Sequence, residues 1–347
     1  MKIKNKFGKE VNIATDGSLA VEIERKYGLS YAQKASSWAY KRYLAEHGVT
    51  KKDVLRALGI EDVSKMQVRA LLENDGTRPL FNAIVEDGLR MGFERGSNWQ
   101  ALTARTIDAD QFSAQWYYLD EDSVDAELLD VGQAAPIPTG TLKLGDQSIR
   151  MHKRGRGIEW TDEARRANID LVALFLQKMG VRLGRQYEDV AVERLLNGYF
   201  PDGFDAAPTL GVDTAGTVTL ADLFYGSAFM EYEYGFTPKI AVMNLETAYT
   251  ITTLRDGDAY LYRDELEAGQ FADVVNSRPF ISNRVPDNRI ILVDTDFALV
   301  RYEGKPFGVE SERSAKTQVE GSYGTEISEF VPFEKNARLI LTLDTAR

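Results

Sequence analysis

The longest regular pattern of apolar and polar residues lies in the middle of the chain, between Thr161 and Asn197. Apolar side chains recur there at the spacing of one helical face, at positions Ile169, Val172, Leu176, Met179, Leu183, Tyr187, Val190 and Leu195. Thr161 is placed to cap this helix and Gly198 to end it. At ~1.5 Å per residue the helix would extend roughly 55 Å. The pattern therefore predicts one helix well beyond the average length in globular proteins.

A different period, with apolar and polar residues alternating, precedes the long helix and predicts an extended arm over residues 111–160. The alternating apolar positions lie on either side of a turn-forming Gly-Asp-Gln segment at 145–147, and they are Leu142, Leu144, Ile149 and Met151. This is the signal of a β-hairpin. Because an isolated two-stranded hairpin is only marginally stable in water, we expect the arm to need another surface.

The chain before the arm has mainly a helical period. Thr50 followed by Asp53 resembles a capping box, and a turn signal at 74–79 separates the first seventy-odd residues from the next amphipathic segment. The predicted helices are residues 30–47, 50–58, 63–72 and 80–93.

After the long helix the pattern changes from α/β to mostly β. Thr219 is placed to cap a second helix, residues 239–243 read as a buried strand, and Asn244 is placed to cap a third helix. Short alternating strands dominate the remainder, including residues 290–293, 297–302 and 337–343. The predicted fold class is mixed α+β.

Length and composition narrow the class of protein. At ~150 residues per domain, 347 residues should form about two packed units. No window approaches the ~20 apolar residues that cross a bilayer, and the N-terminus lacks the apolar stretch of a secretory signal, so we expect neither membrane association nor export. The absence of cysteine excludes disulfides, thiolate zinc sites and cysteine nucleophiles.

The net charge of −11 comes from 53 acidic and 42 basic residues, so the average surface repels a phosphate backbone. That balance disfavours a protein that reads DNA sequence. It does not disfavour a container, because a wall that attracted packed DNA strongly would hinder its release.

Three groups of side chains on the predicted arm are candidates for contact with other subunits. The first consists of the alternating apolar residues Leu142, Leu144, Ile149 and Met151. The aromatic group offers more apolar surface than a monomer usually leaves contiguous, and it consists of Phe112, Trp116, Tyr117 and Tyr118. The densest basic cluster consists of Arg150, Lys153, Arg154 and Arg156. We expect this cluster to meet acidic surface on an adjacent subunit, with a solvated strand end as an equally weighted alternative. A DNA-facing role is less favoured, because no series of stacking aromatics accompanies the cluster.

The other candidate sites favour ordinary structural explanations. The acidic run from Asp120 to Asp130 lacks the glycine and ligand spacing of a calcium loop, so we expect it to be a solvated part of the arm or a partner for a neighbour's arginines. Asp294 and Asp296 are explained by a turn between two strands. Neither a metalloprotease, a nucleophile-elbow nor a nucleotide-binding motif is present. We therefore predict no catalytic residue, no metal and no cofactor, and we interpret three aromatic residues as packing residues: Trp160, Phe175 and Tyr187.

The order of these elements resembles the tailed-bacteriophage major capsid proteins of the Hong Kong ninety-seven type. KRGRGIEWTDEARRANIDLV at 153–172 looks like that family's junction between extended loop and spine helix. LADLFYGSAFMEYEYGFTPKIAVMNLETAYTITTL at 220–254 looks like the helix, strand and helix of its axial domain. The segments FALVRYEGKPFGVESE and FVPFEKNARLILTL resemble the closing strands of its peripheral domain.

The resemblance covers roughly residues 77–347 and implies both a domain plan and a function. The implied plan is an N-terminal helical segment that can be an internal scaffold-like domain (1–76), an N-terminal arm (77–110), an extended loop (111–160), a peripheral domain with the spine helix (161–205 and 285–347) and an inserted axial domain (206–284). The implied function is a non-enzymatic shell subunit that forms the hexamers and pentamers of an icosahedral head. Such a head encloses double-stranded DNA without sequence-specific contact and matures from a procapsid.

The implied partners are further copies of the chain and portal, scaffolding and decoration proteins. The implied location is the virion, after assembly in the host cytoplasm. An encapsulin-like shell that encloses cargo enzymes shares this fold and stays open as an alternative. An enzyme of unassigned chemistry is a weaker alternative, because no convergent ionisable groups are recognisable from spacing.

Overall fold

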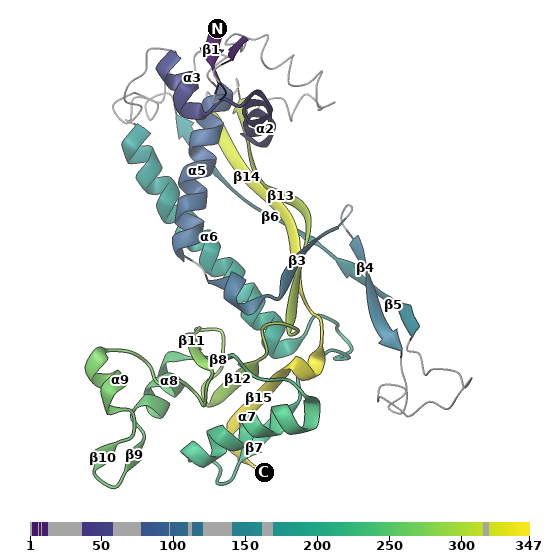
Figure 1. Ribbon diagram of the computed structural model, residues 1–347, viewed down its shortest axis with the longest axis vertical. Helices are drawn as coiled ribbons and strands as arrows, with labels where there is room; N and C mark the ends of the chain where they lie inside the picture. Colours follow the sequence, from purple (N-terminus) through teal and green to yellow (C-terminus); the bar gives the residue numbers. More distant parts are fainter. Residues whose placement is uncertain are drawn as a thin grey trace.

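The computed structural model describes residues 2–5, 7, 9–12, 37–57, 78–96, 98–109, 113–120, 141–161, 169–314 and 319–347. The protein is elongated (Figure 1). Two long helices and a long twisted sheet form one end, a smaller α/β domain forms the other, and a two-stranded arm extends sideways from the long sheet.

Two parallel helices and a four-stranded sheet form the long part, which we call the spine. Its helices are α5 (Arg78–Gly96) and α6 (Ile169–Asn197). Its sheet has the order β3-β13-β14-β6, and the strands are β3 (Arg105–Asp108), β6 (His152–Thr161), β13 (Leu299–Ser314) and β14 (Val319–Pro332). The long antiparallel pair of β13 and β14 is the centre of this sheet, with β6 antiparallel to β14 and β3 parallel to β13. A 3-10 turn at Trp99–Leu102 connects α5 to β3.

Glycines allow α5 and α6 to lie unusually close. A Cβ atom added at Gly92 would lie 2.1 Å from the carbonyl oxygen of Gln177, and one added at Gly180 would lie 2.1 Å from that of Leu89. Since real Cβ atoms do not approach backbone atoms so closely, only glycine fits at these two positions. The helix pair is therefore held in one register by backbone contact.

A five-stranded sheet forms the core of the smaller domain, which we call the five-stranded domain. Its strand order is β11-β8-β12-β15-β7, and the strands are β7 (Thr209–Val212), β8 (Ile240–Met243), β11 (Arg278–Ile281), β12 (Arg289–Val293) and β15 (Arg338–Ala346). The surrounding elements are α7 (Leu220–Tyr234), α8 (Leu245–Thr252), β9 (Arg255–Asp256), β10 (Ala259–Tyr260), α9 (Arg263–Ala268) and a 3-10 turn at Lys335–Ala337. Helices α7 and α8 contribute to one hydrophobic core on this sheet.

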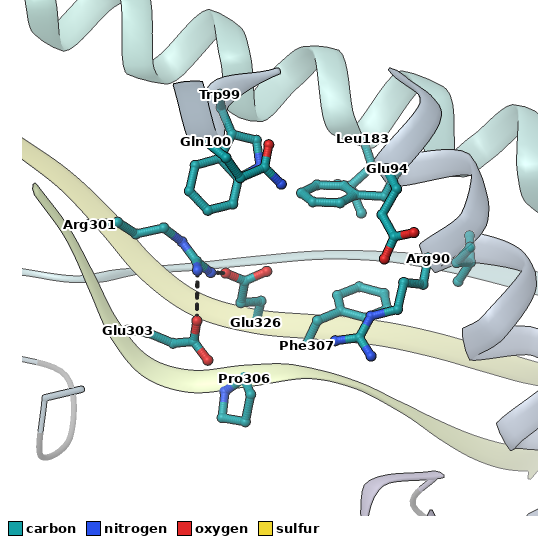
Figure 2. A pocket seen from close by; sticks show the side chains of 12 residues that line it. Arg90, Glu94, Trp99, Gln100, Leu183, Arg301, Glu303, Pro306, Phe307 and Glu326 are labelled. Atoms are coloured by element: carbon teal, nitrogen blue, oxygen red, sulfur yellow. Dashed lines mark hydrogen bonds and ion pairs between the residues drawn. The ribbon is translucent and has the colours of Figure 1, made fainter. Parts of the chain in front are cut away.

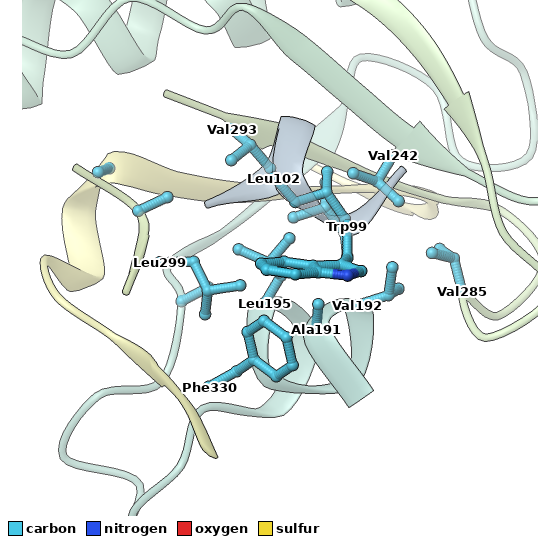
Figure 3. Packing of buried hydrophobic residues seen from close by; sticks show 14 of the residues in the cluster. Trp99, Leu102, Ala191, Val192, Leu195, Val242, Val285, Val293, Leu299 and Phe330 are labelled. Carbon is cyan, nitrogen blue, oxygen red and sulfur yellow. The ribbon is translucent and has the colours of Figure 1, made fainter. Parts of the chain in front are cut away.

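One hydrophobic core joins the two parts of the protein (Figure 3). Trp99 lies edge to face on Phe330, with ring centroids 5.4 Å apart. Around them the cluster combines the last turns of α6, the start of β13 and the inner face of the five-stranded sheet, through Ala191, Val192, Leu195, Val242, Val293 and Leu299. The spine and the five-stranded domain therefore share an interior.

The N-terminal elements pack against the upper end of α5. They are β1 (Lys2–Lys4), β2 (Glu10–Asn12), α2 (Ser37–His47) and α3 (Lys51–Ala57). Tyr40 and Tyr43 of α2 are buried in a cluster that includes Ala83 of α5. Lys41 and Lys51 both pair with Asp87 of α5, which adds an ionic contact to this apolar one.

Several predicted elements are confirmed. Both caps of the five-stranded domain form, because Thr219 accepts a hydrogen bond from the backbone of Asp222 and Asn244 accepts one from Thr247. Thr50 and Asp53 also form the predicted box, and Gly198 follows α6 in the left-handed conformation. The predicted helix at 63–72 and the predicted start of α6 after Thr161 lie outside the described residues, and Thr161 itself ends β6.

Three sequence predictions were wrong in detail. The Gly-Asp-Gln segment at 145–147 is not a turn but lies inside strand β5. Phe175 does not pack in the core, since 53% of its surface is exposed. The predicted strand at 297–302 begins only at Leu299, because Phe297 belongs to the turn that Asp294 and Asp296 form.

The cap of α7 supports a prediction about acid stability. Burial raises the pKa of the Asp222 carboxyl, but hydrogen bonds from Thr219 and from the backbone of Asp213, together with Arg347, outweigh burial and hold the pKa below its ordinary value of 3.8. A lowered pKa stabilises the fold at neutral pH, and this contribution disappears as the pH falls below 3.8. We expect Asp222→Asn to lower the free energy of unfolding at pH 7 by about 1–2 kcal/mol, measured by urea denaturation.

The control for this experiment is Asp258→Asn, an exposed position near the β9–β10 turn, which should leave the unfolding free energy unchanged. The loss in Asp222→Asn should shrink in acid. An equal loss at pH 7 and at pH 3 would contradict an ionic role for Asp222.

Candidate assembly interface

The extended arm consists of β4 (Ser113–Asp120) and β5 (Thr141–Arg150), which form an antiparallel sheet of two strands only. Their register runs from Ser113 opposite Arg150 to Asp120 opposite Thr141. The pair projects away from the spine (Figure 1). No further strand pairs with either one among the described residues, so both outer edges are open.

The Gly-Asp-Gln segment produces an irregularity in this pair. Gln115 lies opposite Ser148 and Tyr117 lies opposite Leu144, so the single residue Trp116 spans the three residues 145–147. Glycine is common at such bulges, because it adopts the local bend without steric cost. The signal that predicted a turn therefore marks a kink within a longer strand.

The base of the arm is anchored on the subunit's own body. Trp116 lies edge to face on Phe200 and Phe204, with ring centroids 5.8 and 5.2 Å apart. Ile149 is fully buried with Phe200 and Val331. Met151, between β5 and β6, is also buried. These three side chains of the predicted contact set, at 116, 149 and 151, thus have partners within the subunit.

Arg154 of the basic cluster is also occupied within the subunit. It donates hydrogen bonds to the Glu329 carboxylate (2.9 Å) and to the backbone carbonyl of Ser328 (2.6 Å). The Glu329 side chain is fully buried and also contacts Arg194 of α6 at 3.3 Å and His152 at 2.6 Å. This carboxylate therefore ties β6, β14 and α6 together where the arm leaves the spine.

The other three members of the cluster, Arg150, Lys153 and Arg156, have exposed side chains. None of them has a carboxylate partner in the part of the chain that the structure describes. Three unpaired cations thus lie along the base of the arm and the outer strand β6. They are the members of the cluster that remain free to meet another subunit.

The remaining predicted contact residues belong to the outer arm. Tyr117, Tyr118, Leu142 and Leu144 lie in the paired segments of β4 and β5. Phe112 lies outside the described residues, and so does most of the acidic run, of which Asp120 ends β4.

A buried ionic group in the spine was missed in the sequence. Arg301 of β13 pairs with Glu303 at 2.7 Å and with buried Glu326, and its guanidinium lies 4.8 Å from the centre of the Trp99 ring. Tyr187 donates a hydrogen bond to Glu326 at 2.6 Å. Burial, followed by the nearby Glu326 charge, raises the pKa of Tyr187 well above its ordinary range. Arg301 and Glu303 are neighbours on β13, but Glu326, Tyr187 and Trp99 come from other segments, so no local spacing reveals the group.

Two kinds of functional feature are absent from the described residues. No three His, Asp or Glu side chains among them are placed to hold a metal ion. None of the described helices combines the length and the apolar character that a membrane crossing requires. His47 Nδ1 lies 2.7 Å from the backbone carbonyl oxygen of Tyr43, and the His47 ring lies against the Tyr43 ring.

Residues 145–328, more than half of the chain, match the family model described as phage capsid protein. The chain belongs to the phage capsid protein family. The match includes β6, α6, most of the five-stranded domain and β13. Membership makes the chain a capsid shell protein and gives it a structural role in a virion. No protein of curated function matches the chain.

Solved structures agree with this family in fold. The chain is similar to the capsid of a native GTA particle, with 15% identity, a TM-score of 0.56, and coverage of 74% of this chain and 91% of that one. It is similar to a virus-like particle from Pyrococcus furiosus, with 10% identity, a TM-score of 0.51, and coverage of 74% and 96%. The mature capsid of bacteriophage PhiM1 gives 10% identity, a TM-score of 0.50, and coverage of 72% and 88%. The mixed α+β fold is therefore the tailed-phage capsid fold of the Hong Kong ninety-seven type.

Proposed function

We propose that this chain is the major capsid protein of a tailed phage, and that its copies assemble into the hexamers and pentamers of an icosahedral head around double-stranded DNA. The observation that carries the proposal is the arm, a two-stranded sheet that projects from the spine. Such a ribbon is marginally stable alone. Lying across a neighbouring copy would cover its open edges, and many such contacts would combine by mass action.

The domain plan extends this proposal to the separate parts. The four-stranded sheet with α6 would be the peripheral domain and spine helix, and residues 206–284 would form the axial domain around which copies gather. Residues 1–76 would be an N-terminal segment retained inside the shell. The proposed partners are portal, scaffolding and decoration proteins, with assembly in the host cytoplasm. Membership of the phage family favours this reading over an encapsulin-like compartment.

Removing the outer arm tests the proposal. Gln115 lies opposite Ser148, so residues 117–147 can be replaced by a short Gly/Ser linker that keeps the anchors at 116, 149 and 151. We expect the purified full-length protein to form rings and closed shells in electron micrographs, and the shortened variant to form no closed shells. Both should show the same melting temperature within a few degrees.

The matched control is a variant in which the 117–147 segment is present but the exposed helix residue Lys178 is changed to alanine, and it should assemble normally. A full-length protein that stays monomeric at high concentration would contradict the proposed function. Shells formed by the shortened variant would show that the arm is not what joins the copies.

A further inference from the structure

A pocket of about 210 Å³ opens on the spine between α5 and the 3-10 turn on one side and β13 and β14 on the other (Figure 2). Its walls include the aromatic rings of Phe93 and Phe307. Glu94 reaches toward the space from α5, and Arg301, Glu303 and Glu326 lie on the side of the sheet. The pocket therefore combines aromatic walls with several carboxylates.

The charges in this pocket leave one carboxylate in excess. Three acidic side chains, Glu94, Glu303 and Glu326, face two basic ones, Arg90 and Arg301. Arg301 is already held by Glu303 and Glu326. Glu94 is exposed and forms no ion pair with Arg90 or with any other described residue. A carboxylate beside aromatic rings suits a guanidinium, which can donate two parallel hydrogen bonds to the carboxylate and lie on a ring face at once.

Two of the three unpaired cations, Lys153 and Arg156, belong to the four-stranded sheet that borders the pocket, and they lie at its far edge. The strand order β3-β13-β14-β6 places β6, with exposed Lys153 and Arg156, at one edge. Toward the other edge, β3 covers β13 only from Val300 to Glu303. Beyond Glu303 the ladder between β13 and β14 is irregular around Pro306, and β13 has no outer strand partner among the described residues. The pocket opens beside this uncovered stretch.

Complementary surfaces on opposite edges of one sheet suit a head-to-tail contact. When each copy offers a cation at one edge and a pocket at the other, the same contact can repeat from copy to copy, and it forms a ring where the rotation between copies closes. We propose that the Arg156 guanidinium of a second copy enters the pocket and pairs with Glu94, between Phe93 and Phe307. Lys153 of that copy adds positive charge beside the pocket mouth. This inference rests on the proposed function, because it names the contact that joins neighbouring copies.

Charge reversal tests the pairing. Glu94→Lys and Arg156→Glu each put like charges into the contact, and each should reduce the assembled fraction by about tenfold or more at low salt. The double variant Glu94→Lys with Arg156→Glu restores opposite charges and should recover most of the assembly. Lys178→Glu makes the same change in net charge as Arg156→Glu on the exposed face of α6, and it should assemble like the unchanged protein. Analytical ultracentrifugation measures all four, and circular dichroism checks their folding.

Crosslinking provides a second measurement that does not depend on assembly yield. The chain contains no cysteine, so a Glu94→Cys preparation mixed with an Arg156→Cys preparation can be joined by a short bismaleimide only between copies. We expect a crosslinked dimer in the mixture and far less of it when Lys178→Cys replaces Arg156→Cys.

The outcomes separate this inference from the proposed function. If the unchanged protein assembles and both single reversals assemble equally well, or if the double variant stays as defective as the singles, the pairing of Arg156 with Glu94 is wrong while the shell function stands. If the unchanged protein does not assemble under any condition, the proposed function fails first.

Discussion

Gly92→Ala should lower the free energy of unfolding by about 3 kcal/mol, although alanine is the better helix former. At a solvent-exposed position within a helix, the same change would raise the free energy of unfolding by about 1 kcal/mol. Here the added Cβ would lie 2.1 Å from the carbonyl oxygen of Gln177 and 2.9 Å from its Cα. Backbone atoms of α6 cannot move aside as a side chain does, so the helices must separate and the contacts around them loosen. Gly180→Ala meets the backbone of α5 in the same way and should have a similar effect.

Guanidinium denaturation of both variants measures this loss. The matched control is Gly226→Ala in α7, where the added Cβ would lie 3.5 Å from a Leu292 methyl group, an ordinary contact distance. That variant should be neutral or more stable. A stabilised Gly92→Ala protein would mean that α5 and α6 are not in backbone contact.

Arg338→Met should also lower the free energy of unfolding by about 3 kcal/mol or more, because it leaves buried carbonyl groups without hydrogen-bond donors. The Arg338 side chain is fully buried and donates to the carbonyls of Arg194 (2.8 Å) and Leu195 (2.9 Å) at the end of α6, and to that of Asp205. Burial lowers the pKa of this guanidinium to about 10, against the opposing effect of the Asp205 and Glu334 carboxylates. Methionine fills much of the volume of the arginine side chain, so the decrease in stability reflects mainly the lost hydrogen bonds.

The control for Arg338→Met is Arg289→Met, an exposed position at the start of the neighbouring strand β12, where we expect a change below about 0.5 kcal/mol. Thermal unfolding followed by circular dichroism measures both. Equal melting temperatures for the two variants would show that the end of α6 does not depend on Arg338.

Local signals predicted local structure well. The caps at Thr219 and Asn244 and the strand at Ile240–Met243 depend on residues that are neighbours in sequence, and all three are present. The middle and end of the long helix were predictable for the same reason, from the apolar period and from Gly198.

Pairing over longer distances was not predictable. The true partner of β5 is β4, which precedes it by more than twenty residues, and the nearer turn signal at 145–147 concealed that pairing.

The spacing of apolar residues also cannot decide which of two adjoining faces of a helix is covered by other parts of the protein. Phe175 therefore looked like a core residue, although it lies with exposed Leu171 and Leu174 on the outer side of α6. No local pattern indicates that the carboxylates of Glu326 and Glu329 are buried, because their cationic partners lie on other segments.

In the proposed shell, the shared core around Trp99 and Phe330 would limit how a subunit adapts to positions of different curvature. Rotating the five-stranded domain about the end of α6 would open a filled interior and expose Leu195, Val242 and Leu299 together. That motion is costly, so the spine and the five-stranded domain should keep the same relative orientation in flat and in strongly curved parts of the proposed shell. The adjustment would then fall on the arm and on the proposed charged contacts at the sheet edges, which can shift without breaking any packed interior.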